Sequence, residues 1–373
     1  MIKYCKNCLN PSTRPNTYFS KEGLCPVCIF EKKKSGQKIN WFEREKEILK
    51  IKKWGQKNTK NSYDCIVTIS GGKDSMRQAF YARDNLGMNP LLVSSLYPPE
   101  HMHERGARNI SNLINHGFDC ISLSLDPIKW KELLRHGLFK FGNFARACEM
   151  ALYAIPIHIA IAHKIPLLFY GENPVLTIGE KHGRTDGNAL KIQEANTIKG
   201  GPKSLEFADL TDHDAYFYEY PSYKEIKQAK LKIVYLGYYI KDWYGFKNAD
   251  LAIKQGLEVR SAKPNEIGDL WGFSALDDDF TMVNQYLKYL KFGFGRVTDQ
   301  VCEAIHQGML TREEAVKLVK KYDGKCSKKY IKLFCKYLEI TEQAFWTNVD
   351  KNVVNKKLFK KVKNNWVPKF KVQ

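Results

Sequence analysis

The sequence predicts an α/β protein with a parallel sheet, an N-terminal four-cysteine zinc module and a helical C-terminal region. Between residues 61 and 239, apolar strand patterns alternate with helical patterns, as in a parallel sheet covered on both faces. Two Cys-x-x-Cys pairs precede this stretch, and amphipathic helical patterns follow it. The expected strands are 65–69, 91–95, 120–125, 167–170 and 233–239, and the expected helices are 73–86, 104–116, 127–138 and 144–163.

The composition is that of a globular protein with an anion-attracting surface. The chain has 373 residues, of which 43% are hydrophobic and 13% aromatic, which is enough for two domains and a sizeable core. The 60 Lys and Arg residues outnumber the 40 Asp and Glu residues, giving a net charge of +20. This charge suits nucleic acid, anionic lipid or small anionic substrates, and by itself it does not choose among them.

We expect a cytoplasmic protein with reduced cysteines. The first residues carry no apolar segment of a signal peptide. The most apolar stretch, 151–170, is interrupted by prolines, histidines and a lysine, so we interpret it as a buried helix followed by a strand. Without an export signal, the paired cysteines among the ten should be metal ligands rather than disulfides.

The two Cys-x-x-Cys pairs have the spacing of a structural zinc site. They are Cys5 with Cys8 and Cys25 with Cys28, separated by sixteen residues. Each pair brings two thiolates to one side of a turn, and four thiolates complete a tetrahedron. The segment between the pairs has little apolar content and would not fold without the metal. A redox Cys-x-x-Cys would instead sit beside a βαβ pattern, which is not adjacent here.

We divide the chain into four segments. Residues 1–30 form the zinc-binding module, 31–60 a lysine-rich linker helix, 61–268 the sheet domain, and 269–373 a helical region with a basic tail. The lysines of the linker are more typical of a solvated helix face than of a binding surface. From residue 351 onward there are eight lysines and no acidic residue, a pattern that could contact nucleic acid, an acidic partner or nothing.

A glycine-rich loop follows the first expected strand. Two glycines let the backbone approach an anion closely, and the first turn of the next helix directs its N–H groups toward it. Lys73 adds a positive charge, whereas Asp74 would repel a phosphate unless Mg²⁺ lay between them. A metal-bound nucleotide is therefore the expected ligand. The loop consists of Ser70, Gly71, Gly72, Lys73, Asp74 and Ser75.

This loop differs from the Walker A motif, because Val67 and Asp74 occupy positions where that motif has Gly and Ser or Thr. The six residues instead match in full the loop of the PP-loop ATP pyrophosphatases, which have an adenine nucleotide α-hydrolase-like, Rossmann-like fold. The resemblance implies that ATP and Mg²⁺ bind here, that a substrate oxygen attacks the α-phosphate, and that the loop holds the departing pyrophosphate.

Other candidate residues lie at the carboxyl end of the fourth expected strand. Ligands bind at this edge of parallel sheets, so Glu172 and Asn173 are candidates to hold Mg²⁺ or the reacting group. The alternative is that they form an ordinary capping turn before a loop, and we favour the functional interpretation. The irregular segment 175–222 is expected to be a substrate loop. We assign Cys148 to the core, and the acids at 277–279 to the N-terminal dipole of a helix.

The combination of motifs resembles the N-acetyl sugar amidotransferases of the WbpG or PseA type, enzymes of pseudaminic-acid and lipopolysaccharide O-antigen synthesis. The resemblance covers nearly the whole chain. It rests on the cysteine pairs, the loop 70–75, Gly171-Glu172-Asn173, the acids at 277–279, 291–296 with Thr298-Asp299, and 311–315. It implies that an acetamido oxygen is replaced by NH, giving an acetamidino sugar, with Lys73, Asp74, Glu172 and Asn173 as catalytic candidates.

The resemblance also implies partners. The substrate would be an N-acetylated sugar, nucleotide-linked or acidic. Ammonia would come from a separate HisH-like glutaminase, in some systems with a HisF-like subunit, because residue 2 is Ile rather than a nucleophilic Cys. No membrane contact is expected.

Two other readings remain open. Certain tRNA thiolation enzymes join zinc knuckles to the same loop, and the charge of +20 would suit tRNA. Those enzymes generally carry further cysteines for sulfur transfer, whereas here Cys65, Cys120, Cys148, Cys302, Cys326 and Cys335 are scattered singly. A zinc-knuckle RNA-binding protein without enzymatic activity would leave the nucleotide loop unexplained.

Overall fold

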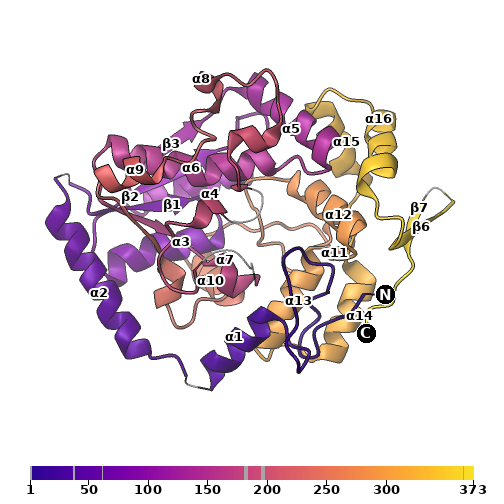
Figure 1. Ribbon diagram of the computed structural model, residues 1–373, viewed down its shortest axis with the longest axis horizontal. Helices are drawn as coiled ribbons and strands as arrows, with labels where there is room; N and C mark the ends of the chain where they lie inside the picture. The colour runs from indigo at the N-terminus through magenta and orange to yellow at the C-terminus, as the bar shows by residue number, and fades with distance from the viewer. Residues whose placement is uncertain (1, 37, 61, 180–183, 195–197, 364) are drawn as a thin grey trace.

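The computed structural model describes residues 2–36, 38–60, 62–179, 184–194, 198–363 and 365–373. Its centre is a five-stranded sheet in the order β3-β2-β1-β4-β5, and every pair of neighbours is parallel (Figure 1). The predicted α/β class with a parallel sheet is therefore confirmed. The strands are β1 (Cys65–Ile69), β2 (Pro90–Leu96), β3 (Cys120–Ser124), β4 (Leu167–Tyr170) and β5 (Lys232–Tyr235).

The strand order reverses at β1. The chain proceeds from β1 outward to β2 and β3, and then returns to the other side of β1 to form β4 and β5. Register pairs Ile66 of β1 with Leu91 on one side and with Leu168 on the other. Because β1 and β4 are neighbouring parallel strands, the loops that follow them lie side by side at the same edge of the sheet. From these two loops the chain continues in different directions. Crevices at such switch points are the usual ligand sites of open α/β sheets.

Alternate residues of the strands face two separate cores, as the two-residue period of a strand requires. Ile66, Leu168 and their neighbours pack against α5 (Pro127–Phe141) and α6 (Arg146–Ala162). Val67, Phe169 and their neighbours pack against the other layer of helices. That layer contains α2 (Trp41–Asn58), α3 (Lys73–Phe80) with its π-helical extension η1 (Tyr81–Asn85), α4 (Glu104–Asn115) and α10 (Gly245–Lys254).

The N-terminal module packs on the C-terminal helices. Its four cysteines and Leu9 share a buried cluster with apolar side chains of α13 (Arg296–His306) and α14 (Arg312–Tyr322). The two chain ends accordingly lie close together (Figure 1). The segment expected as one linker helix forms α1 (Pro26–Ser35) and α2, which meet at a bend.

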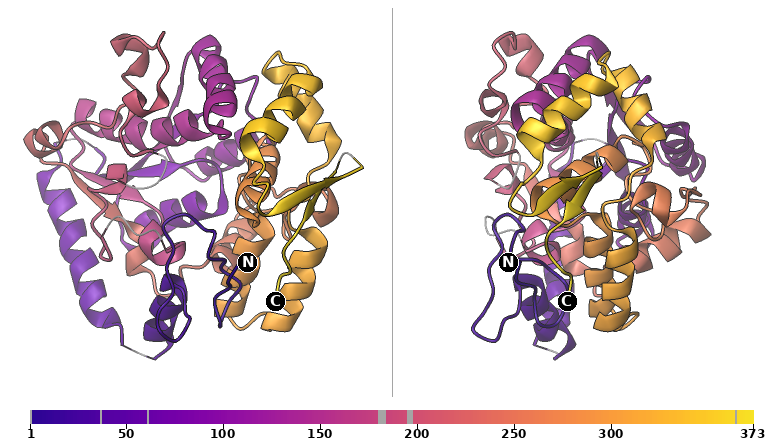
Figure 2. Two further views of the ribbon diagram at one scale, coloured as in Figure 1. Left: turned by 45° about the vertical axis from the view of Figure 1, so that its right-hand side comes forward. Right: turned by 90° about the vertical axis from the view of Figure 1, so that its right-hand side faces the viewer.

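The C-terminal region is helical, as expected, but it ends in a hairpin. The short helix α11 (Pro264–Ile267) precedes this region, and the region's other helices are α12 (Thr281–Phe292), α15 (Lys328–Tyr337), α16 (Glu342–Asn348) and the π-helical η6 (Val349–Val353). The basic tail forms the antiparallel strands β6 (Phe359–Val362) and β7 (Asn365–Pro368). Figure 2 shows this yellow hairpin projecting beside the C-terminal helices.

The region after β4 is less regular. Short helices occupy parts of the expected substrate loop, of which 180–183 and 195–197 lie outside the described residues. Where a longer last strand was expected, the chain turns after Tyr235 into a 3₁₀ helix. The elements are α7 (Pro174–Thr177), η2 (Ile192–Glu194), η4 (Pro202–Leu205), α8 (Asp212–Ala215), α9 (Tyr223–Gln228) and η5 (Leu236–Tyr239). Among the described helices, none is long and apolar enough to cross a membrane.

Candidate functional site

The glycine-rich loop lies at the carboxyl end of β1, where the strand order reverses. Gly71 has φ = +73°, a conformation that favours glycine, and a Cβ there would lie 3.0 Å from the carbonyl oxygen of Gly106. The Ser75 hydroxyl accepts hydrogen bonds from the N–H groups of Ser70 (3.3 Å) and Gly72 (3.1 Å). It also donates to the carbonyl of Gly72 at 2.9 Å. Ser75 therefore fixes the loop backbone by its own side chain.

Lys73 and Asp74 begin α3 and face the same cavity. Their side chains form an ion pair, and Asn248 of α10 donates a hydrogen bond to the second carboxylate oxygen of Asp74 at 2.7 Å. Burial lowers the pKa of Lys73, but the carboxylates of Asp74, Glu303 and Glu172 outweigh this and raise its pKa above the usual value. Lys73 therefore remains a cation at neutral pH.

A cavity of about 350 Å³ opens beside this loop. Parts of the chain that are far apart in sequence form its walls: the carboxyl edge of the sheet, the N-terminal module with α1 and α2, residues 237–245, residues 273–275 before α12, and helix α13. Polar side chains contributed by these parts include Lys73, Asp74, Glu172, Asn173, Arg14, Lys34, Arg44, Arg296, Asp299 and Glu303.

Carboxylates are crowded on one side of the cavity. Glu172 lies two residues after the end of β4. Its side chain is open to the cavity, and protein encloses it on the other sides. This burial, together with the charge of Asp74, raises its pKa to about 7, against the opposing effect of Lys73. Burial also raises the pKa of Glu303 on α13. A divalent cation would relieve this crowding, and carboxylate oxygens are the ligands that Mg²⁺ prefers, so Asp74 and Glu172 fit such an ion.

Asn173 borders the same cavity but uses its side chain locally. Its amide nitrogen donates to the carbonyl oxygens of Arg184 and Asp186, both at 2.8 Å. Its amide oxygen accepts from the N–H of Val175 at 3.0 Å and so caps α7. In this arrangement Asn173 shapes the loop after β4, and its predicted catalytic role stays a prediction.

Two cationic groups of the cavity wall were not singled out in the sequence. The Lys34 ammonium lies 3.5 Å from the ring centre of Tyr244, and burial lowers its pKa to about 8. The Arg44 guanidinium lies 3.6 Å from the ring centre of Tyr238 and donates to the carbonyl of that residue at 2.7 Å. Both come from the lysine-rich segment that we had interpreted as a solvated face. Only tertiary packing brings them over aromatic rings beside the cavity.

Ion pairs of Asp299 join the N-terminal module to α13. The Asp299 carboxylate pairs with Arg14, and Lys288 of α12 donates to its other oxygen at 2.7 Å. Burial raises the pKa of Asp299, but Lys288 and Arg14 outweigh it and hold the pKa well below its usual range. The carboxylate therefore stays ionised and joins the N-terminal module to the cavity wall.

The four predicted zinc ligands lie together. All four sulfur atoms lie within 4.8 Å of one another, and all four side chains are buried. The Sγ atoms are 3.6 Å apart for Cys5 and Cys28 and 3.7 Å apart for Cys8 and Cys25. Four converging thiols with no open position fit a structural zinc ion. The Nε2 atom of His306 on α13 lies 3.1 Å from the sulfur of Cys28, so this helix contacts the cluster directly.

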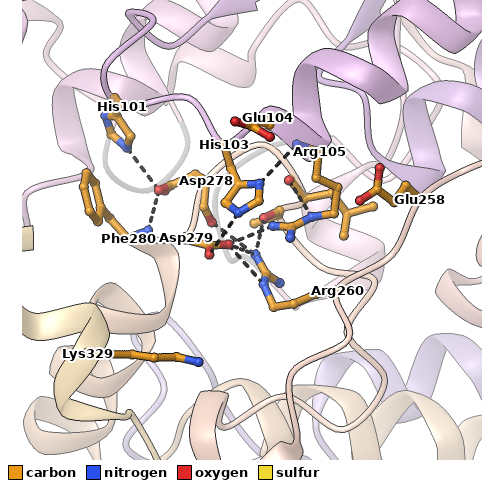
Figure 3. A network of polar contacts seen from close by, with 12 residues as sticks. His101, His103, Glu104, Arg105, Glu258, Arg260, Asp278, Asp279, Phe280 and Lys329 are labelled. Atoms are coloured by element: carbon orange, nitrogen blue, oxygen red, sulfur yellow. Dashed lines mark hydrogen bonds and ion pairs between the residues drawn. The ribbon is translucent and has the colours of Figure 1, made fainter. Parts of the chain in front are cut away.

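The acids at 277–279 precede α12, which begins at Thr281, and each has a distinct environment. Asp278 contacts Nε2 of His101 at 3.0 Å, and Asp279 forms ion pairs with Arg105 (2.8 Å) and Arg260 (2.9 Å) (Figure 3). These contacts join the segment before α12 to the sheet domain. Asp278 also accepts a hydrogen bond from the N–H of Phe280, the N-cap residue of α12, at 2.6 Å, so the predicted role at the start of the helix is joined by contacts that the sequence did not indicate.

A second cavity, of about 200 Å³, borders Ser70 of the loop. Ala275 lines both cavities, so the two adjoin at the segment before α12. Most of the lining is apolar or aromatic. It includes Cys148, which is 8% exposed and whose thiol pKa is raised by burial, consistent with the predicted core position.

Comparison with known proteins concerns the C-terminal part of the chain. Residues 273–371 match the family model described as the C-terminal domain of WbpG-like LPS biosynthesis proteins. The chain carries a WbpG-like C-terminal domain. The resemblance expected from the sequence is confirmed for this part, whereas the cysteine cluster and the loop 70–75 lie outside the match. No curated protein matches the chain.

The WbpG-like domain reaches both cavities. Its matched residues include Phe273 and Arg296 in the first cavity and Asp277 in the second. It also contains Asp279, the acid that pairs with both Arg105 and Arg260. A domain associated with LPS biosynthesis proteins therefore contributes directly to the surroundings of the glycine-rich loop.

Proposed function

We propose that this chain is an ATP-dependent amidotransferase that converts the N-acetyl group of a bacterial surface-polysaccharide sugar into an acetamidino group. The observation that carries the proposal is the position of the loop 70–75. It lies at the switch point of a parallel sheet, beside a charged cavity, in a chain with a WbpG-like C-terminal domain.

The chemistry requires activation of a poor electrophile. The amide oxygen of the sugar attacks the α-phosphorus of ATP, and the bond from that phosphorus to pyrophosphate breaks. Ammonia then adds to the amide carbon and loses a proton, and the C–O bond breaks as AMP leaves with its electron pair. The products are the amidine, AMP and pyrophosphate. The protein's contribution is to position the reactants, stabilise charge and exclude water.

The residues of the cavity suit these tasks. The start of α3 and the Lys73 ammonium would hold the pyrophosphate as negative charge develops on it. Asp74 and Glu172 would hold Mg²⁺, which when bound supplies neutralisation of phosphate charge. The raised pKa of Glu172, caused by burial and then by the charge of Asp74, supports this assignment, because like charges in a confined space favour a cation.

The cationic side chains of the cavity favour an anionic sugar derivative. Lys34 and Arg44 lie on the wall formed by α1 and α2, and Arg296 lies at the start of α13. A nucleotide-linked sugar and a sugar acid share the negative charge that such groups attract. Aromatic side chains between them, including Trp41 and Tyr244, offer flat apolar surfaces to a sugar ring.

Ammonia is expected from a separate glutaminase. Purified protein should therefore turn over with ammonium, and glutamine alone should not support the reaction. Glutamine-driven turnover by the purified chain would contradict this part of the proposal.

The decisive experiment measures AMP and pyrophosphate release from ATP and ammonium, with N-acetylated nucleotide-sugars, pseudaminic acid or unmodified tRNA as acceptor. We expect release that depends on a sugar, together with replacement of one oxygen by NH in the product mass. Lys73→Ala should lower turnover by roughly 100-fold or more. Lys46→Ala, on the outer face of α2, is a matched control that should retain activity.

Release stimulated by tRNA alone would instead favour the tRNA-thiolation alternative. Full turnover by the Lys73→Ala variant would refute the role of the loop. Neither result would change the match to the WbpG-like family model. Either result would mean that this match does not imply the proposed chemistry.

A further inference from the structure

The second cavity combines an apolar lining with one acid, Asp277, that has no side-chain hydrogen-bond donor among the described residues. Its walls come from the ends of β1 and β2 and from α6, with Tyr97, Trp130 and Ile155 among the apolar side chains. Ser70 and Ser95 add hydroxyl groups, and Asp277 contributes the carboxylate. The cavity borders the first residue of the glycine-rich loop. A ligand whose phosphates occupy the loop could therefore extend into it.

Asp277 is held rigidly in this position. Its carbonyl oxygen accepts a hydrogen bond from the N–H of His103 at 2.8 Å. Gly106 of α4 approaches so closely that a Cβ there would lie 2.5 Å from the Asp277 Cα atom. Gly106 in turn contacts Gly71, as described above. The backbone of Asp277 is thus packed through α4 against the loop itself.

The carboxylate of Asp277 differs from those of its two neighbours. Asp278 and Asp279 have strong side-chain partners, but no described side chain donates a hydrogen bond to Asp277. Burial, followed by the charge of Asp278, raises the pKa of Asp277 to about 7. Its own backbone N–H is the hydrogen-bond donor that the carboxylate has, so it keeps acceptor capacity that a ligand could use. Neutral hydroxyl donors would fit, because a carboxylate accepts hydrogen bonds readily.

We propose that Asp277 recognises the nucleoside of the bound nucleotide by accepting a hydrogen bond from a ribose hydroxyl, with the base in the apolar second cavity. This inference rests on the proposed use of ATP. Of the two cavities that border the loop, the first is lined by charged groups suited to phosphates and an anionic acceptor. The second has the apolar and aromatic lining that a planar base requires. The ribose then lies between base and phosphates, where Asp277 can reach it.

The inference gives the WbpG-like domain a specific task. Asp277 is a residue of that domain, whereas the loop belongs to the sheet. Nucleotide recognition would be completed only when the segment before α12 is docked on α4. Asp277 would be a specificity-determining residue, because it distinguishes a ribonucleotide from its deoxy analogues.

The test compares the affinities of ATP, 2′-deoxy-ATP and 3′-deoxy-ATP by calorimetry, for the wild-type chain, Asp277→Ala and Asp277→Asn. Removing the recognised hydroxyl should weaken binding to the wild type by about tenfold, as expected for one hydrogen bond to a charged group. Asp277→Ala should bind all three nucleotides with nearly equal affinity. Asp277→Asn, which keeps a neutral acceptor, should discriminate to an intermediate degree.

Asp250→Asn is a matched control, because this acid lies on the exposed face of α10 and pairs with Lys254. It should discriminate as the wild type does. Equal wild-type affinities for the three nucleotides, or full discrimination by Asp277→Ala, would overturn the inference while leaving ATP binding intact. Absence of any ATP binding to the wild type would overturn the proposed function as well. The deoxy analogues test the unmodified protein, so a folding defect of a variant cannot decide the outcome.

Discussion

Gly106→Ala should push the segment before α12, in the WbpG-like domain, away from the glycine-rich loop. Gly106 lies in the first turn of α4, between Gly71 on one side and Asp277 on the other. The added methyl group would lie 2.5 Å from the Cα atom and 2.7 Å from the Cβ atom of Asp277. Ordinary contact begins at 3.4 Å, so the segment before α12 must move by about 0.9 Å.

The expected loss of stability depends on which atoms the added methyl group would contact. Overpacking a close-packed site costs about 1–3 kcal/mol, and a backbone atom cannot rotate away as a flexible side chain can. We therefore expect a loss of about 2–3 kcal/mol. For a chain of 373 residues, that loss corresponds to a melting temperature lowered by roughly 3–4 °C. Movement of Asp277 should also weaken ATP binding, by about tenfold if its hydrogen bond to the ribose is lost.

The assay pairs thermal denaturation with calorimetric titration of ATP. Gly117→Ala is the matched control. Gly117 has φ = +85° and nothing within 4 Å of an added Cβ. Its substitution should cost about 1 kcal/mol through backbone strain and leave ATP affinity unchanged. An unchanged melting temperature for Gly106→Ala would refute the packing argument. Lower stability with unchanged ATP affinity would refute the coupling of this segment to the nucleotide site.

Three further predictions concern the metal, a buried ion pair and pH. Purified protein should contain about one zinc ion per chain by elemental analysis, and Cys25→Ser should release it and lower the melting temperature, because the module has little apolar core of its own. Asp279→Ala should destabilise the chain by about 3–5 kcal/mol in denaturant titrations, because it leaves two buried guanidinium groups without their shared partner. Glu104→Ala, at a carboxylate 87% exposed, should cost less than about 0.5 kcal/mol. Affinity for ATP with Mg²⁺ should rise as the pH increases through about 7, because Glu172 is protonated below its pKa and becomes a metal ligand above it. Glu172→Gln should bind more weakly and lose most of this pH dependence.

Each of these predictions has an opposing outcome. A zinc-free chain of unchanged stability would mean that the four cysteines hold no structural metal. Equal costs for the substitutions of Asp279 and Glu104 would show that the pairs with Arg105 and Arg260 add nothing across the domain contact. An unaltered pH dependence in the Glu172→Gln variant would assign the titration to another group.

The sequence predicted those parts of the protein whose signals are local. The five strands were predicted because apolar runs of strand length alternate with amphipathic helices. The cysteine cluster was predicted because its ligand spacing is fixed by tetrahedral geometry. The loop 70–75 and Glu172 were expected at one edge of the sheet, and Lys73, Asp74 and Glu172 indeed line one cavity. Parallel strands bring their carboxyl ends together whatever the order of the strands.

The rest of the cavity depends on contacts between distant segments. Lys34 and Arg44 belong to a lysine-rich stretch, and the sequence gives no sign that these two cations, rather than their neighbours, lie over aromatic rings. Asp277 looked like one of three equivalent helix-capping acids. Its difference from Asp278 and Asp279 arises only from where His101, Arg105 and Arg260 lie after folding. Differences of this kind leave no periodicity or spacing in the sequence from which they could be predicted.

The arrangement explains why the loop alone cannot define the reaction. In the proposed function the loop and β1 would bind the phosphates, whereas the walls around them come from the cysteine module, α13 and the segment before α12. Asp299 joins two of these walls through Arg14, and His306 joins α13 to the cysteine cluster. Loss of the metal should therefore disturb the cavity wall as well as the module, without touching the loop. The residues of the cavity walls would then determine which substrate binds. The loop and the segment before α12 would bind the nucleotide.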